Sequence, residues 1–104
     1  MKKTLFILSL SATAALSAVP AFADQALATS KNCMTCHSVE KKILGPAFKE
    51  VAAKYSGDKT AADKLATKVI KGGSGVWGSA YMPANSQVSE AEAKKLVAWV
   101  LSLK

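Results

Sequence analysis

Residues 33–37 read CMTCH, and the interpretation of the whole chain starts from this pentapeptide. Two cysteines three positions apart, followed at once by a histidine, form the Cys-x-x-Cys-His pattern that attaches c-type haem. At the end of a helix, thiols with this spacing can reach the two vinyl groups along one porphyrin edge and form thioethers. The imidazole of His37 then lies under the macrocycle and can bind iron. We therefore predict one covalent haem c, held by Cys33 and Cys36, with His37 as a ligand of the iron.

Two other uses of these cysteines are less favoured. A redox-active dithiol would need a βαβ context, which the periodicity of the chain does not predict. A zinc site would need further cysteines or histidines, whereas the chain has only two cysteines and one histidine.

The N-terminus has the pattern of a secretory signal peptide. Two lysines precede an apolar run over about residues 5–19, and the small-residue triplet AFA follows at 21–23. We predict cleavage after Ala23, which makes 1–23 the signal peptide and 24–104 the mature domain. The alternative, an uncleaved anchor, is disfavoured because the apolar run is short, and no second run is long enough to span a bilayer.

The charge of the chain is strongly basic, with 14 Lys+Arg against 7 Asp+Glu and a net charge of +7. Two of these charges leave with the predicted signal peptide. The basic surface favours acidic partners, but nucleic acid is disfavoured, because the chain has no arginine and its lysines are spread over several predicted helices. So small a domain has a marginal core unless a cofactor or another staple completes it.

Helical periodicity dominates the mature chain, which therefore reads as all-α, with helices and loops but no strands. A short helix is expected over 25–32. A second begins at Pro46 and ends before Gly57, and a third begins with Thr60 as N-cap and stops at Gly72. The last begins at a capping box, Ser89 with Glu92. The expected apolar faces are Phe48, Val51, Ala52 and Tyr55; Leu65, Val69 and Ile70; and Ala93, Leu96, Val97, Val100 and Leu101.

The segment 72–88, GGSGVWGSAYMPANSQV, shows no period and exceeds the usual length of loops without a function. It contains Met82, which elimination favours as the second axial ligand. His37 is the only histidine, both cysteines are used, Met1 leaves with the signal peptide, and Met34 sits inside the attachment motif. A gap-filling loop methionine, an open site or a lysine ligand are the alternatives. We predict that Cys33, Cys36, His37 and Met82 face one apolar cavity, and that haem orders this segment.

Four stretches together resemble the small bacterial class I cytochromes c of the cytochrome c-551 type: CMTCH, LGPAFKEVAAKY, GVWGSAYMPAN and AKKLVAWVLSLK. The resemblance covers essentially all of 24–104. It implies the single-domain class I cytochrome c fold, with about four short helices wrapped around one covalently attached haem. It also implies a periplasmic one-electron carrier of a respiratory chain with His/Met ligation, rather than an enzyme.

The resemblance further implies roles for four residues around the haem. Pro46 would accept a hydrogen bond from His37 through its carbonyl, and Trp77 would donate its indole N–H to a haem propionate. Lys68 matches a basic position near that propionate, and Asn85 would bond near the Met82 sulfur. The plainer alternatives are a helix start for Pro46, a core position for Trp77 and a solvated lysine for Lys68.

The sequence departs from the family pattern just after Met82. Ala84 stands where a second proline is frequent, and the connection to the last helix is about one residue longer, around Gln87.

By the same resemblance, an apolar patch surrounds the exposed haem edge, formed by Met34, Ile43, Ala80, Tyr81 and Pro83. A ring of lysines is expected around it, at Lys31, Lys41, Lys42 and Lys49, and the alternative is a uniformly solvated lysine surface. A basic rim of this kind steers acidic redox partners. The expected donor is a quinol-oxidising complex, and the expected acceptor is a nitrite reductase, a terminal oxidase or a peroxidase. The mature protein is expected to be a monomer without a membrane span.

Three other functions are alternatives to electron transfer. A small haem peroxidase would need an open distal site and a distal acid–base residue, normally a second histidine. A gas or redox sensor would require a ligand to displace Met82, and a thiol oxidoreductase would leave the cysteines free. The single histidine disfavours the peroxidase, and the absence of a signalling domain in the sequence disfavours the sensor. The intact mass of the mature protein decides against the oxidoreductase if it includes one covalent haem.

Overall fold

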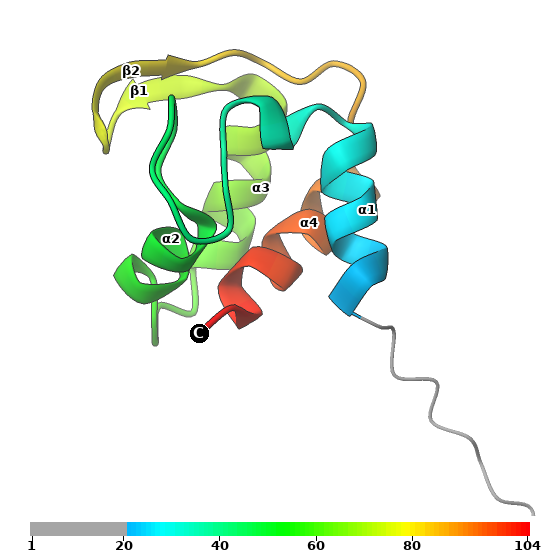
Figure 1. The fold of residues 1–104 in the computed structure, drawn as a ribbon, viewed down its shortest axis with the longest axis horizontal. Helices are drawn as coiled ribbons and strands as arrows, with labels where there is room; N and C mark the ends of the chain where they lie inside the picture. The colour runs from blue at the N-terminus through cyan, green and yellow to red at the C-terminus, as the bar shows by residue number, and fades with distance from the viewer. Residues whose placement is uncertain (1–20) are drawn as a thin grey trace, which may run out of the picture.

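The computed structural model describes residues 21–104, which form four α-helices, a short 3₁₀ helix and a β-hairpin (Figure 1). In chain order these are α1 (Ala21–Ser30), the 3₁₀ helix η1 (Cys33–Thr35), α2 (Phe48–Lys54), α3 (Ala61–Lys71), β1 (Gly73–Gly75), β2 (Gly78–Met82) and α4 (Glu90–Ser102). The expectation of about four short helices is confirmed. Residues 1–20 of the predicted signal peptide lie outside the described residues, and α1 runs across its predicted cleavage site.

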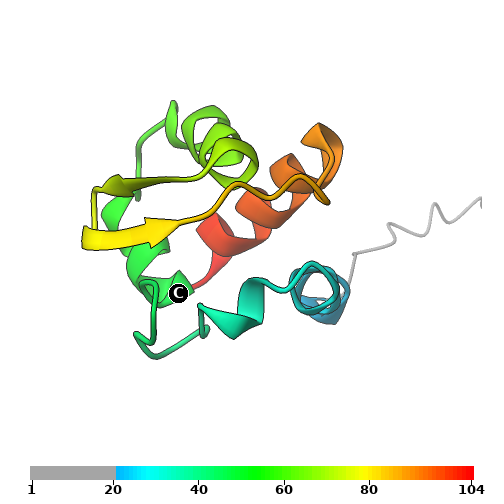
Figure 2. The same ribbon diagram turned by 90° about the horizontal axis from the view of Figure 1, so that it is seen from above.

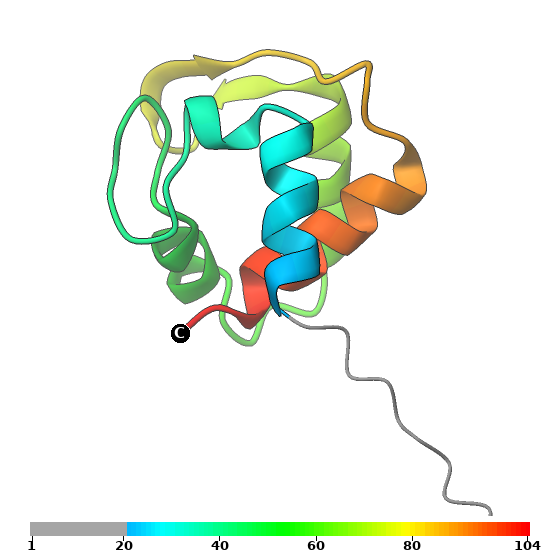
Figure 3. The same ribbon diagram turned by 45° about the vertical axis from the view of Figure 1, so that its right-hand side comes forward.

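Helix α4 lies at the centre of the helical packing, against α1, α2 and α3 (Figures 1 and 3). Its start is the predicted capping box: Ser89 Oγ accepts from the Glu92 N–H at 3.1 Å, and Glu92 Oε1 accepts from the Ser89 N–H at 3.0 Å. Two backbone donors that a helix start would leave unpaired are thereby satisfied. The inward face buries Ala93, Leu96, Val97, Trp99 and Val100. No helix within residues 21–104 is long and apolar enough to cross a membrane.

The starts of α2 and α3 differ from the sequence prediction. Pro46 is not in the first turn of α2, because Ala47 is the N-cap in an extended conformation. Thr60 occupies the N-cap position of α3, but its hydroxyl does not cap the helix. Instead Asp58 Oδ1 accepts from both the hydroxyl and the N–H of Thr60, at 2.7 and 2.8 Å. The Thr60 hydroxyl is thereby engaged with the carboxylate of the preceding turn and not with the backbone of α3.

The segment 72–88 is not wholly irregular, so the prediction of a chain without strands was wrong here. Strands β1 and β2 pair as an antiparallel hairpin, with Gly73 opposite Met82 and Gly75 opposite Gly78. Figure 2 shows this hairpin beside α3, with the chain after β2 running back to the start of α4. The strands are only three and five residues long and consist largely of Gly, Ser and Ala, so they carry no alternating pattern.

Candidate functional site

The attachment motif is folded as a tight turn directly after α1. Asn32 adopts a left-handed conformation with φ 66°, which asparagine tolerates better than most residues. The N–H groups of Cys36 and His37 both donate to the carbonyl of Cys33, at 3.2 and 3.0 Å. This turn brings the two half-buried thiols and the imidazole into one short stretch of chain.

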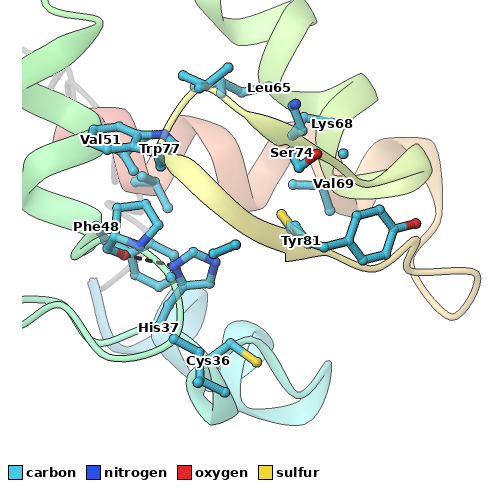
Figure 4. A pocket seen from close by; sticks show the side chains of 18 of the residues that line it. Cys36, His37, Phe48, Val51, Leu65, Lys68, Val69, Ser74, Trp77 and Tyr81 are labelled. Carbon is cyan, nitrogen blue, oxygen red and sulfur yellow. Dashed lines mark hydrogen bonds between the residues drawn. The ribbon is translucent and has the colours of Figure 1, made fainter.

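His37 is held by a hydrogen bond and by ring stacking, and Figure 4 shows its imidazole beside Phe48. Its Nδ1 lies 2.8 Å from the carbonyl oxygen of Pro46, and its ring stacks on Phe48 with centroids 4.8 Å apart. A Cβ at Gly45 would lie 2.5 Å from His37 Cε1, so only glycine leaves room for the ring. Because a carbonyl can only accept, Nδ1 carries the hydrogen and Nε2 keeps its lone pair for a metal.

Two neighbouring cavities, of about 390 and 290 Å³, share His37 and Met82 in their walls. Cys36 lines both, and Cys33 lines the smaller one. The smaller cavity is therefore lined by all four residues, as the sequence predicted. Their roles toward the haem stay predictions. The rest of the shared wall is apolar: Phe48, Val69, Pro83, Val97 and Val100.

The apolar side chains around the larger cavity fit a bulky, flat, mostly apolar group. Leu44, Val76 and Tyr81 line this cavity and remain 68, 47 and 68% exposed. Among the side chains that the structure describes, those of residues 24–104, no large one is less than 2% exposed, even in the core beside α4. Large hydrophobic side chains that face a common hollow at this exposure are well suited to packing against a porphyrin.

Met82 is positioned by the hairpin and by the end of α3. It is the last residue of β2, half-buried, and pairs in register with Gly73. Gly72 ends α3 with φ 72°, and a Cβ there would clash with the Met82 carbonyl oxygen. Close approach of α3 to the Met82 backbone therefore depends on a glycine at this position.

The residues assigned by family resemblance are all near the cavities. Pro46, Lys68 and Trp77 line the larger one and Asn85 the smaller. Lys68 extends over Gly73, where its Nζ would lie 2.7 Å from an added Cβ. The Nζ of Lys54 stands over the Trp77 ring, 5.4 Å from its centroid, at a cation–π distance.

The Asn85 side chain makes contacts that the sequence did not predict. Its Nδ2 donates to the carbonyls of Val69 at 2.8 Å and Pro83 at 3.3 Å, and its backbone N–H donates to Ile70 at 3.1 Å. These bonds join the chain after Met82 to the last turn of α3. The bond from Asn85 to the Met82 sulfur stays a prediction.

The sequence interpretation missed Gly45, Gly72 and the stacking role of Phe48. Phe48 was assigned only to the inner face of its helix, and in the structure it supports the His37 ring as well. A signal was present for Gly45, which stands directly before Pro46 in the LGPAF stretch. Its contact with His37 nevertheless depends on how the chain folds back after the motif.

Two of the four lysines expected to ring the haem edge are engaged in ion pairs. Lys49 Nζ lies 2.9 Å from Glu40 Oε1, and this bond holds the pKa of Glu40 below its ordinary value. Lys31 Nζ lies 3.2 Å from Glu92 Oε2. Neither Lys41 nor Lys42 belongs to an ion pair of the described residues, and Lys42 also lines the larger cavity.

The environment of the cysteines is unlike that of a reactive dithiol. Burial is the main reason why the pKa of Cys33 is raised, whereas reactive thiols have lowered pKa values. Within residues 21–104, no group of three or more His, Cys, Asp or Glu side chains is arranged to hold a metal ion, as a zinc site would require.

Comparison with known proteins gives concordant matches over nearly the whole chain. The family model for cytochrome c matches residues 24–104. Cytochrome c-551 of Allochromatium vinosum is 52% identical over 91 residues, covering 88% of this chain and 97% of that protein. Cytochrome c-552 of Nitrosomonas europaea is 49% identical over 102 residues, covering 98% and 99%. A crystal structure of wild-type cytochrome c552 from Nitrosomonas europaea superimposes with a TM-score of 0.75 at 51% identity, covering 77% of this chain and 99% of that one.

Proposed function

The chain belongs to the cytochrome c family, and from this we propose that it is a periplasmic one-electron carrier whose haem iron is bound by His37 and Met82. Membership makes the chain an electron carrier rather than an enzyme, with haem c attached through Cys33 and Cys36. The axial ligands, the residues around them, the location and the partners are our proposals. One observation carries the ligand assignment: His37, oriented by Pro46, and Met82 line the same apolar cavities.

When bound, haem c supplies the one-electron chemistry, by cycling between ferrous and ferric iron. The chain supplies orientation and environment. The Pro46 carbonyl holds the His37 imidazole in one tautomer and makes Nε2 a better donor. Met82 contributes a soft thioether, which favours the ferrous state. The apolar walls act in the same direction, because they disfavour the additional positive charge of the ferric state.

Three residues would hold the polar side of the cofactor and the loop beside it. Lys68 places an ammonium group at the cavity wall and would pair with a haem propionate. Trp77 would donate its indole N–H to the same carboxylate, since a partly buried indole needs an acceptor. Asn85 would keep Met82 on the iron, and its bonds to Val69 and Ile70 support that role.

Docking would occur at the exposed apolar rim, with redox proteins that carry acidic surfaces. Ile43, Leu44 and Tyr81 are 48, 68 and 68% exposed, and Lys41 and Lys42 precede the first two in the chain. A basic rim speeds encounter while a small apolar contact allows rapid release. The proposed donor is a quinol-oxidising complex. The proposed acceptors are a nitrite reductase, a terminal oxidase or a peroxidase. We propose that the protein docks with each of them as a monomer.

Export to the periplasm is proposed from the N-terminal sequence. The lysines, the apolar run and the AFA triplet predict cleavage after Ala23, and the family model begins its match at the next residue. N-terminal sequencing and the intact mass of the periplasmic protein test both points. The expected mass is that of 24–104 plus one haem, and a mass without haem would refute the attachment.

The spectrum of the mature protein tests the axial ligands. We expect a low-spin spectrum with the near-infrared Met–Fe(III) absorption in the wild type and in Met34→Leu. Met34 is the matched control, because it also lies beside the haem-binding residues but inside the attachment motif. Met82→Ala should lose the absorption, bind carbon monoxide rapidly when reduced and have a lower reduction potential. Rapid carbon monoxide binding by the wild type at neutral pH would rule out stable ligation by Met82.

A further inference from the structure

The chain between Met82 and α4 takes part in a hydrogen-bond network whose centre lies outside both cavities. Gln87 Nε2 donates to the carbonyl of Lys31 at 3.1 Å, and Lys31 Nζ donates back to the carbonyl of Gln87 at 3.0 Å. These residues are 56 positions apart in the chain. Lys31 directly follows α1 and stands two residues before Cys33. The reciprocal pair therefore joins the attachment turn to the segment that carries Met82.

The carboxylate of Glu92 extends this network to the start of α4. Its Oε1 accepts from the Ser89 N–H at 3.0 Å, while its Oε2 lies 3.2 Å from Lys31 Nζ. The two charged side chains are only 24 and 33% exposed, so water and salt screen this pair less than a fully exposed one. One lysine thus binds both the loop and the helix that follows it.

A second anchor acts on the opposite side of the same segment. Gln87 Nε2 also lies 3.1 Å from Asn85 Oδ1, and Asn85 Nδ2 donates to the Val69 carbonyl of α3. The segment from Met82 to Gln87 is therefore bound at two points. Asn85, in the middle of the segment, is bonded to α3, and Gln87, at its end, is bonded to the residue that follows α1. Movement of Met82 away from the cavity would disturb these contacts.

We propose that Lys31, Gln87 and Glu92 form a staple that holds the Met82 segment against the attachment turn and so sets how often Met82 leaves the iron. The inference rests on the proposed function, because it requires Met82 as an axial ligand. The three staple residues line neither cavity, so they act on the ligand only by positioning its chain.

The test is the rate at which imidazole replaces Met82 in the mature ferric holoprotein. Imidazole binds iron only after Met82 has left, so the rate reports the opening of this segment. Gln87→Ala removes two hydrogen bonds, and Lys31→Met removes the ammonium from both of its acceptors. Each variant is expected to bind imidazole roughly 3- to 30-fold faster, the change that corresponds to losing one or two hydrogen bonds.

Glu90→Gln is the matched control. It removes an exposed ion pair of α4, with Lys94 Nζ 3.4 Å from Glu90 Oε1, and touches neither the loop nor α1. Its imidazole rate should stay within about twofold of the wild type, because such pairs contribute little. The rates are measured far below the unfolding temperature, so that local opening of this segment and not global unfolding limits them.

Three results would overturn the inference, and they are distinguishable. Unchanged imidazole rates in both variants would show that the staple does not restrain Met82. An equal acceleration by Glu90→Gln would show a non-specific effect. A wild type without the near-infrared Met–Fe(III) absorption would refute the proposed ligation and the staple with it. If Lys31→Met yields no holoprotein, the rate of Gln87→Ala alone decides.

Discussion

Replacing Gly45 by alanine should displace the His37 ring. A Cβ at this position would lie 2.5, 2.9 and 3.1 Å from Cε1, Nδ1 and Nε2 of the imidazole. The backbone itself would accept alanine, because Gly45 is not among the residues with positive φ. The whole effect therefore comes from contact with the ring.

The size of the effect follows from what holds the ring in place. The ring would need to move by about half an ångström to bring the closest contact to 3.0 Å. Such a shift disturbs both the 2.8 Å contact with the Pro46 carbonyl and the stack on Phe48. Overpacking of this kind costs about 1–3 kcal/mol. For a domain of this size, that lowers the unfolding temperature by on the order of 5–20 °C.

The assay combines thermal unfolding of the mature ferric holoprotein with its optical and near-infrared spectrum. Gly57→Ala is the control, because Gly57 has φ 78° and nothing within 4 Å of an added Cβ. It should lower stability by about 1–2 kcal/mol through backbone strain alone and leave the spectrum unchanged. Gly45→Ala should lower stability and also shift the absorption bands that report the His–iron bond.

One result would refute this reasoning: a Gly45→Ala holoprotein with wild-type stability and a wild-type spectrum. The ring would then have room that the structure does not show. A loss of stability with an unchanged spectrum, as in Gly57→Ala, would place the effect in the loop and leave the position of His37 independent of Gly45.

Three further predictions concern the Met82 segment and the start of α4. Gly72→Ala should weaken the near-infrared Met–Fe(III) absorption, because the added Cβ meets the Met82 carbonyl. Gly75 has φ 100° and open space around it, so Gly75→Ala should lower stability but keep the absorption. Equal spectra of the two variants would contradict this. The hydrogen bond from the Ser89 N–H is the main reason why the pKa of Glu92 lies below its ordinary value of 4.5, and the bond from Lys31 is the second. Ionised Glu92 therefore stabilises the fold above pH 4.5, and this stabilisation is lost as the pH falls through the lowered pKa. The melting temperature of the wild type should therefore exceed that of Glu92→Gln at about pH 6 and converge with it toward about pH 3, and a gap that is independent of pH would disprove the linkage. Amide hydrogen exchange across 72–88 should be slower in holoprotein than in apoprotein, since haem is expected to order this segment; equal rates would contradict that expectation.

Much of the site was predictable because its signals are local. The Cys33–Cys36 spacing with His37 next in the chain reflects the chemistry of a single turn. Elimination of the other methionines needed only the chain order. The capping box of Ser89 and Glu92 is also contained within one turn, and the structure confirms it.

The errors in the predicted fold share one cause: they concern hydrogen bonds of main-chain N–H and C=O groups, which side-chain patterns do not reveal. Pro46 was placed in the first turn of α2, but it precedes the N-cap and its carbonyl binds His37. The hairpin was missed because Gly73 and Met82 pair through the main chain, and their side chains give no alternation. Propensities describe side chains and cannot show which distant carbonyl an N–H will meet.

The sequence by itself determined the cofactor, its attachment and the preference for Met82, because covalent spacing and residue counts do not depend on the fold. Only the tertiary structure decided that Gly45 makes room for His37, that Gly72 lets α3 approach Met82, and that Gln87 binds Lys31. Each of these is a contact between atoms that the sequence separates or that local propensity ignores. Such contacts arise only when the chain folds back on itself and brings these segments together, as where the Gly45 N–H donates to the Cys36 carbonyl and where Gly73 pairs with Met82.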